Sequence, residues 1–156
     1  MAKKVMILED DEAIAELMKF YLREEGFQTS ISSKGEGFAD KVAEYQPDPI
    51  TLDVMLPDTD GFSIFRVLQQ DERTRDIPVI FVTVTEGEKE KGIRMGASGY
   101  IVKRISRDFQ GGERRNKTFQ RAGQKKFVTD YPYKKKELQS AISERSRWKT
   151  VFEPGS

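Results

Sequence analysis

Residues 50–61 read Ile-Thr-Leu-Asp-Val-Met-Leu-Pro-Asp-Thr-Asp-Gly, and this stretch decides the fold. A short apolar run ends at Asp53, and residues 57–61 then have the composition of a tight turn. Apolar side chains next recur at the spacing of one helix face, at Phe62, Phe65 and Leu68. A buried strand that leads through a turn into a helix is a βα unit, the building block of parallel sheets.

The same alternation extends on both sides of this unit. Apolar runs predict strands at residues 5–8, 27–31, 50–52, 79–82 and 100–102. Amphipathic stretches between them predict helices near residues 14–22, 38–45, 62–68 and 88–95. Five strands that alternate with four helices predict an α/β fold, in which right-handed crossovers place helices on both faces of a parallel sheet.

Composition limits the chemistry that this chain of 156 residues can perform. It contains no Cys and no His, which excludes disulfides, thiolate nucleophiles, imidazole catalysis and Cys or His metal ligands. No apolar run approaches the ~18 residues of a membrane-spanning helix, and no signal peptide precedes the first strand. We therefore expect a soluble, cytoplasmic protein that uses carboxylates, hydroxyls, amines or a metal that prefers oxygen ligands.

The net charge of +1 conceals a strong polarity along the chain. Residues 1–103 carry 20 acidic and 13 basic side chains, whereas residues 104–156 carry 6 acidic and 14 basic ones. The composition changes just after the fifth predicted strand. We therefore expect a core domain over residues 1–104 and an atypical basic segment over residues 105–156.

The carboxyl ends of parallel strands meet at one edge of the sheet, where open α/β folds place their sites. The residues at the predicted strand ends are Glu9, Asp10, Asp11, Asp53, Thr83 and Lys103. Carboxylates held together repel each other by roughly 4 kcal/mol per pair at ~4 Å and an effective dielectric of ~20. A cation is therefore expected among them, and oxygen ligands suit Mg²⁺.

An unprotonated carboxylate beside Mg²⁺, an amine and a hydroxyl suits phosphoryl transfer. Carboxylate nucleophiles accept phosphoryl groups and form acyl phosphates, while cations neutralise the charge that develops. A salt bridge from Lys103 to one of the acids is the alternative role for this amine. The two roles are compatible, because the salt bridge belongs to the resting state.

Four motifs occur in a fixed order along the chain. They are Ile-Leu-Glu-Asp-Asp-Glu at residues 7–12, Leu-Asp-Val-Met-Leu-Pro-Asp-Thr-Asp-Gly at 52–61, Ile-Pro-Val-Ile-Phe-Val-Thr at 77–83 and Gly-Ala-Ser-Gly-Tyr-Ile-Val-Lys at 96–103. Together they resemble the receiver domain of two-component response regulators, over about residues 3–103. The resemblance implies a flavodoxin-like, doubly wound sheet of five parallel strands in the order 2-1-3-4-5.

The resemblance also implies a phosphorelay mechanism. Asp53 would accept a phosphoryl group from a phosphohistidine on a sensor histidine kinase, and Thr83 and Lys103 would contact the phosphoryl oxygens. The domain would then change its binding to a downstream effector. Its own activity would be limited to self-catalysed phosphorylation and dephosphorylation, so that it is a signalling domain more than a dedicated enzyme.

A metal site and a switch follow from the same resemblance. The expected Mg²⁺ ligands are Asp10, Asp11, Asp53 and the main-chain carbonyl of Met55. The expected switch residues are Thr83 and Tyr100: Thr83 would move toward the phosphoryl group and Tyr100 would turn inward. An ordinary partly buried strand aromatic is the alternative for Tyr100.

Two positions depart from the usual receiver pattern. Val84 follows Thr83 where many receivers carry Ala or Gly, a feature similar to receivers of hybrid sensor kinases, and its bulk is expected to slow the attack of water on the phosphoryl group. Arg104 stands where the family has a proline with a cis bond. A cis bond to a non-proline residue costs ~2.5–4 kcal/mol, so we expect a trans bond here and a less firmly aimed Lys103 amine.

The segment 105–156 allows three interpretations. Residues 134–148 predict an amphipathic helix that replaces the missing fifth helix, with an apolar side formed by Leu138, Ala141, Ile142 and Trp148. The basic and aromatic residues between 114 and 136 alternatively form a nucleic-acid arm. In the third interpretation, the receiver is truncated near Arg104 and the remainder is foreign to it.

Two rival functions share this set of residues. A phosphohydrolase of the haloacid-dehalogenase type also forms an aspartyl phosphate, but it expects a second acid two residues after the nucleophile, where this chain has Met55. A phosphate-independent pseudo-receiver would bind its partner without chemistry. The presence of acid, hydroxyl and amine at all the expected positions argues against the second rival.

Overall fold

The computed structural model describes residues 3–85, 87–103, 138, 139 and 142. Five strands form one sheet in which all neighbouring strands are parallel, in the order β2-β1-β3-β4-β5. The strands are β1 (Lys4–Leu8), β2 (Gln28–Ser32), β3 (Ile50–Leu52), β4 (Val79–Thr83) and β5 (Gly99–Val102). This arrangement confirms the predicted α/β fold and its strand order.

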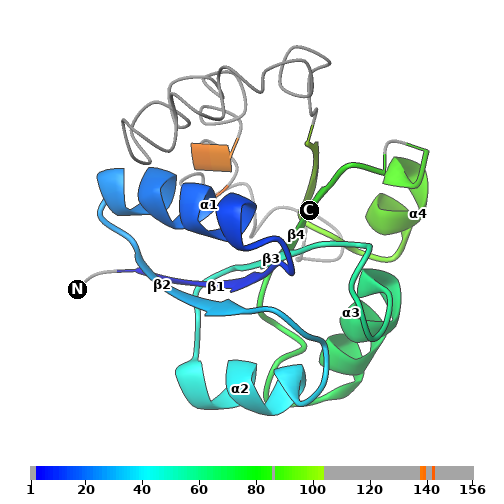
Figure 1. Cartoon of the computed structure of the whole chain (residues 1–156). Coiled ribbons are helices and arrows are strands. Elements are labelled where there is room, and N and C mark those ends of the chain that lie inside the picture. Colours follow the sequence, from blue (N-terminus) through cyan, green and yellow to red (C-terminus); the bar gives the residue numbers. More distant parts are fainter. Residues whose placement is uncertain (1–2, 86, 104–137, 140–141, 143–156) are drawn as a thin grey trace, which may run out of the picture.

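Four helices connect the strands, as predicted. They are α1 (Glu12–Glu24), α2 (Phe38–Tyr45), α3 (Gly61–Gln70) and α4 (Lys89–Arg94). Figure 1 shows α1 on one face of the sheet and α2 and α3 on the other. Two of these helices begin at side-chain caps: at α1 the carboxylate of Asp11 accepts from the amide of Ile14 (3.1 Å), and at α3 that of Asp60 accepts from the amide of Ser63 (2.9 Å).

The sheet separates two apolar cores, one on each of its faces. We call the face that α1 covers the first face, and the face that α2 and α3 cover the second face. The first face joins α1 to alternate residues of three strands, Val5, Ile7, Ile80, Val82 and Ile101. The second face joins α2 and α3 to the intervening residues, Met6, Leu8, Ile50, Leu52, Val79, Phe81 and Tyr100. Because both sides are covered, β1 and β4 are apolar over most of their length, whereas the edge strand β2 is largely polar.

Aromatic side chains concentrate on the second face. The ring of Phe81 lies 5.1 Å from that of Phe62, 5.6 Å from that of Phe65 and 5.8 Å from that of Tyr100, measured between centroids. Gly92 lets α4 approach this group, because a Cβ atom there would lie 3.0 Å from the Tyr100 ring. The second face is thus closed by helices that follow one another in the chain.

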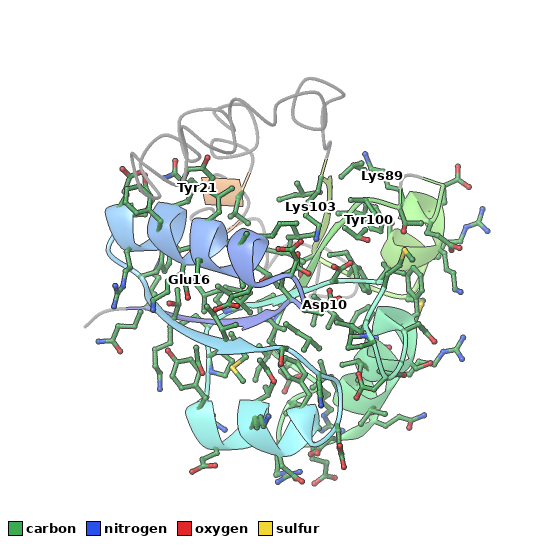
Figure 2. All side chains as sticks on the ribbon, in the orientation of Figure 1. Asp10, Glu16, Tyr21, Lys89, Tyr100 and Lys103 are labelled. Carbon is green, nitrogen blue, oxygen red and sulfur yellow. The ribbon has the colours of Figure 1, made fainter. Side chains whose placement is uncertain are left out.

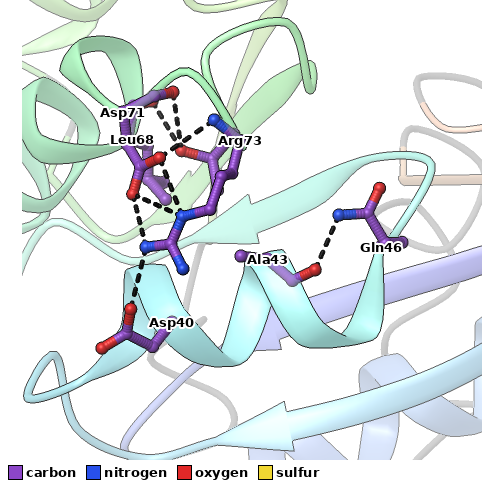
Figure 3. Close-up of polar contacts among 7 residues, drawn as sticks. Asp40, Ala43, Gln46, Leu68, Asp71 and Arg73 are labelled. Atoms are coloured by element: carbon purple, nitrogen blue, oxygen red, sulfur yellow. Dashed lines mark hydrogen bonds and ion pairs between the residues drawn. The ribbon is translucent and has the colours of Figure 1, made fainter.

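A polar contact joins α2 to the end of α3 at the surface (Figure 3). The guanidinium of Arg73 pairs with Asp40 on α2 at 2.8 Å and with Asp71, the residue after α3, at 2.7 Å. Both Arg73 and Asp40 are largely exposed, so this pairing adds little to stability. It fixes the relative position of two helices that the second face already holds.

Three residues of the C-terminal segment are described, and all three are helical: Leu138, Gln139 and Ile142. Leu138 and Ile142 are buried on the first face, and Figure 1 shows them in orange on the α1 side of the sheet. The remaining residues of the predicted helix 134–148, the basic stretch 114–136 and Arg104 lie outside the described residues. The predictions made for them stay predictions.

Candidate functional site

Side chains from four strands meet at the carboxyl edge of the sheet, where Figure 2 labels Asp10 and Lys103. Glu9 and Asp10 follow β1, Asp53 follows β3, Thr83 ends β4 and Lys103 follows β5. The amide of Lys103 donates to the carbonyl of Thr83 at 2.7 Å, which extends the pairing of β4 and β5 to the edge itself. The structure therefore places residues that are far apart in sequence around one point, as expected for a parallel sheet.

Lys103 is the centre of a buried ionic network. Its amine pairs with a carboxylate oxygen of Glu9 and with Oδ2 of Asp53, the latter at 3.1 Å. The side chains of all three residues are less than one tenth exposed. Removing one member of a buried pair leaves an uncompensated charge, so the three groups depend on each other.

The two acids of this network differ in protonation. Burial raises the pKa of Glu9 to about 8, and the neighbouring Asp53 adds to the increase while the charge of Lys103 opposes it. Burial also acts to raise the pKa of Asp53, but Glu9 and Lys103 outweigh it and hold this pKa below its ordinary value. The environment therefore favours the ionised form of Asp53, whereas it opposes ionisation of Glu9. An ionised carboxylate is the form that acts as a nucleophile.

Asp11 is the predicted Mg²⁺ ligand that the structure places outside the acidic cluster. Its carboxylate caps α1 instead. The acids that do cluster are Glu9, Asp10 and Asp53, which each offer one oxygen within 4.8 Å of the others. The structure therefore brings Glu9, and not Asp11, together with Asp10 and Asp53, and the role of Asp11 as an Mg²⁺ ligand stays a prediction.

Main-chain hydrogen bonds explain why Glu9 lies in the acidic cluster. The amide of Glu9 still donates to the carbonyl of Ser32 at 3.0 Å, so the pairing of β1 with β2 continues one residue beyond the strand. Glu9 thereby keeps the alternation of Val5 and Ile7, whose side chains lie on the first face. This alternation is a sequence feature that distinguishes Glu9 from the acids that follow it.

The acidic cluster fits a hard divalent cation. All of its ligand atoms are carboxylate oxygens, which suit Mg²⁺ and other hard cations better than soft transition metals. Oε2 of Glu9 is buried and has no hydrogen-bond partner among the described residues. A buried oxygen of this kind requires a proton or a ligand. Asp10 is exposed and keeps the cluster open on its outer side.

The loop after β3 is held close to Asp53 by backbone contacts. The amide of Met55 donates to Oδ1 of Asp53 at 3.2 Å, while the Met55 side chain is 63% exposed. The amide of Gly61 donates to the carbonyl of Val54 at 2.7 Å. A Cβ atom on Gly61 would lie 2.1 Å from the Asp53 carbonyl oxygen, so only glycine permits this approach.

Thr83 and Tyr100 lie on the other side of the cluster. Thr83 is fully buried, and its hydroxyl accepts from the amide of Thr85 at 3.4 Å. The hydroxyl of Tyr100 donates to the main-chain carbonyl of Thr85, so the ring is turned inward. Burial raises the pKa of Tyr100 to about 12, and the phenol stays protonated. Val84 is 44% exposed between these contacts.

Side chains alternate between the two faces along β4 and β5, so the Thr83 hydroxyl and the Lys103 amine reach the carboxyl edge from opposite faces. Thr83 continues the series of Val79 and Phe81 on the second face, whereas Lys103 continues that of Ile101 on the first face. A group bound at Asp53 can therefore meet a hydroxyl on one side and an amine on the other.

A comparison with known families gives a clear result. The model of the response regulator receiver domain matches residues 5–109, which is more than half of the chain. The chain belongs to the response regulator receiver domain family. The family predicted from the four motifs is confirmed, and residues 5–109 form the match to the receiver domain.

Curated and structural relatives agree with this assignment. The receiver domain is 35% identical over 106 residues to the transcriptional regulatory protein GltR of Pseudomonas aeruginosa, which covers 67% of this chain and 44% of that protein. The chain thus spans less than half the length of this curated relative. A sensor protein from Polaromonas sp. JS666 is 32% identical, with a TM-score of 0.61 over 69% of this chain and 89% of that one.

A more distant structure shows the fold alone. The response regulator described as putative from Chloroflexus aurantiacus J-10-fl is 21% identical, with a TM-score of 0.64 over 90% of this chain and 99% of that one. Among the described residues of the receiver domain, no helix combines the length and the apolar character that crossing a membrane requires.

Proposed function

We propose that this receiver domain is a phosphorylation-dependent switch in which Asp53 accepts a phosphoryl group from a sensor histidine kinase. The observation that carries the proposal is the state of Asp53. It is a buried carboxylate with a lowered pKa, beside the Lys103 amine at 3.1 Å. Thr83, a buried hydroxyl, ends the adjacent strand.

The proposed chemistry uses these groups directly. An oxygen of Asp53 attacks the phosphorus atom, and the bond from phosphorus to the donor nitrogen of a phosphohistidine breaks, which leaves an acyl phosphate on Asp53. The Lys103 amine then neutralises the charge of the phosphoryl oxygens from the first face, and the Thr83 hydroxyl donates a hydrogen bond to them from the second face. Hydrolysis of the acyl phosphate by water returns the domain to its resting state.

The proposal includes Mg²⁺ as cofactor. Glu9, Asp10, Asp53 and the main-chain carbonyl of Met55 would hold it. When bound, Mg²⁺ supplies positive charge against the phosphoryl oxygens. Two observations support this choice: the ligands are all oxygens, and Oε2 of Glu9 has no hydrogen-bond partner in the part of the chain that the structure describes.

A conformational response completes the proposal. Thr83 would move toward the phosphoryl group, and the contact of Tyr100 with the Thr85 carbonyl would change with it. The altered surface would bind a downstream effector in the cytoplasm. The names of the relatives in Pseudomonas and Polaromonas, a transcriptional regulator and a sensor protein, describe two settings in which such a domain occurs.

Metal-dependent phosphorylation tests the proposal. The protein is incubated with acetyl phosphate and MgCl₂, and the intact mass is measured. One added phosphoryl group per chain is expected, with loss of labelling in Asp53→Asn and in excess EDTA. Asp76→Asn, which changes an exposed acid far from the edge, is the matched control and should label as wild type does.

Other outcomes identify the rival functions. Many turnovers of a phosphate ester would favour the phosphohydrolase, and a complete absence of labelling would favour the pseudo-receiver. Labelling that persists in Asp53→Asn would place the acceptor elsewhere and overturn the proposal.

A further inference from the structure

The aliphatic stem of Lys103 lies in apolar surroundings that end in the C-terminal segment. A cavity of about 30 Å³ on the first face is lined by Ile14, Leu17, Met18, Tyr21, Val82, Ile101, Lys103 and Leu138. Its walls are apolar, so a water molecule would find none of the two to four polar partners that it needs there. The stem of Lys103 therefore borders an apolar cavity, while its amine is held by the two acids.

The C-terminal residues are firmly seated against this surface. Leu138 is 4% exposed and Ile142 is fully buried, and the two are one helical turn apart. The side-chain amide of Gln139 donates to the main-chain carbonyl of Tyr21 on α1 at 3.1 Å. Two apolar anchors and one hydrogen bond thus fix the position of Leu138 relative to α1.

We propose that these three residues, which we call the C-terminal contact, position the amine of Lys103 for phosphoryl transfer. Leu138 lines the same apolar cavity as the Lys103 stem, together with residues of α1, β4 and β5. The amine is then held toward Glu9 and Asp53 and cannot turn away along the first face. This inference rests on the proposed function, because it assigns a role in the same reaction.

The local sequence explains why such support is needed. Lys103 is the first residue after β5, and its amide makes the last described main-chain bond of that strand. Arg104 follows, so the chain has no proline at this point to restrict the backbone. A long, flexible side chain at a strand end has many accessible rotamers, and packing on its stem is what selects one.

Lysine labelling measures the positioning without any phosphorylation. The folded protein is treated briefly with an amine-reactive acetyl ester, and labelling of Lys103 is measured by peptide mass spectrometry relative to the exposed Lys89 (Figure 2). In Leu138→Ala, labelling of Lys103 should rise by a factor of about 5–30, as expected for a loss of one to two kcal/mol of packing. Leu138→Met, which preserves side-chain volume, should keep the protection.

A matched control separates positioning from general loosening. Leu68→Ala removes the same atoms from an equally buried site on the second face, away from Lys103. It should leave the ratio of Lys103 to Lys89 labelling within about twofold of wild type, since distant sites act independently. Equal effects of Leu138→Ala and Leu68→Ala, or no effect of Leu138→Ala, would overturn the inference.

Phosphorylation rates then test the functional consequence. Leu138→Ala should slow labelling by acetyl phosphate about tenfold or more when Lys103 is present, because small displacements of reacting groups are costly. It should have no effect in a Lys103→Met background, which keeps the stem and removes the amine. Slowing in both backgrounds would overturn the positioning role. A wild type that accepts no phosphoryl group, while Lys103 protection behaves as expected, would overturn the proposed function alone.

Discussion

The two faces of the sheet are closed by different parts of the chain. The second face is covered by helices that follow one another between its own strands and is centred on Phe81. The first face is covered by α1 and by Leu138 and Ile142, which lie 35 and 39 positions after Lys103. Glu9 and Lys103 enter the site from the first face. The carboxyl edge of the sheet therefore depends on the first face, which is completed by residues that are distant from Lys103 in the sequence.

The largest expected effect is on the second face. Phe81→Ala removes the ring that contacts Phe62, Phe65 and Tyr100, and it should reduce the free energy of unfolding by about 3–5 kcal/mol. Urea unfolding followed by far-ultraviolet circular dichroism measures this loss. A loss below about 1 kcal/mol would mean that the aromatic group is not the centre of this face.

Ile142→Ala makes the corresponding change on the first face. If the C-terminal contact is an integral part of this core, the free energy of unfolding should fall by about 2–4 kcal/mol. The same urea experiment with Leu68→Ala provides the matched value for the second face. A loss for Ile142→Ala far below that of Leu68→Ala would show that the two faces are closed with unequal strength.

Glu9→Gln tests the carboxyl edge of the sheet through the pH dependence of the free energy of unfolding. The pKa of Glu9 is raised from 4.5 to about 8, so the folded protein binds this proton more tightly than the unfolded chain does. Stability is therefore lost as the pH rises from about 4.5 to 8, by at most ~1.4 kcal/mol per pH unit for one proton. The lowered pKa of Asp53 acts in a separate window, below 3.8.

Thermal unfolding in EDTA at several pH values between about 5 and 9 measures this slope. Glu9→Gln should flatten it, while Glu44→Gln, a change at an exposed position, should retain the wild-type slope. A wild-type slope in Glu9→Gln would assign the pH dependence to another group.

The smallest effect on stability is expected at Val84, which belongs to neither core. Val84→Ala should change the free energy of unfolding by no more than about 0.5 kcal/mol, because the side chain is 44% exposed. It should nevertheless shorten the lifetime of the phosphoryl group, since a smaller side chain beside Thr83 leaves attacking water more room. Lifetimes are measured by intact mass after removal of the phosphodonor, and equal lifetimes would remove this role.

Much of the fold could be predicted because local sequence and burial agree. Continuous apolar runs such as Val79 to Val82 indicated strands covered on both sides, and the turn at residues 57–61 indicated the start of α3. Strand ends then located Asp53, Thr83 and Lys103, since a parallel sheet gathers such positions at one edge.

The exchange of Asp11 for Glu9 shows where this reasoning stopped. Residues 9–12 are four consecutive acids, and only the extent of β1 decides which of their side chains points into the edge. The C-terminal contact was harder to predict for a different reason. The helical spacing of Leu138 and Ile142 was visible in the sequence, but their partner on α1 is more than a hundred residues away, and periodicity does not indicate which distant element a helix packs against.

In the loop after β3, the contacts that hold the backbone near Asp53 do not involve the side chain that is exposed to a binding partner. Gly61 and the Met55 amide fix the backbone near Asp53, and the carboxylate of Asp58 accepts from the amides of Gly35 and Glu36 at 3.0 and 2.9 Å. None of these contacts uses the exposed Met55 side chain. A substitution of the Met55 side chain should therefore leave the backbone around Asp53 in place, and with it the phosphoryl acceptor that we propose.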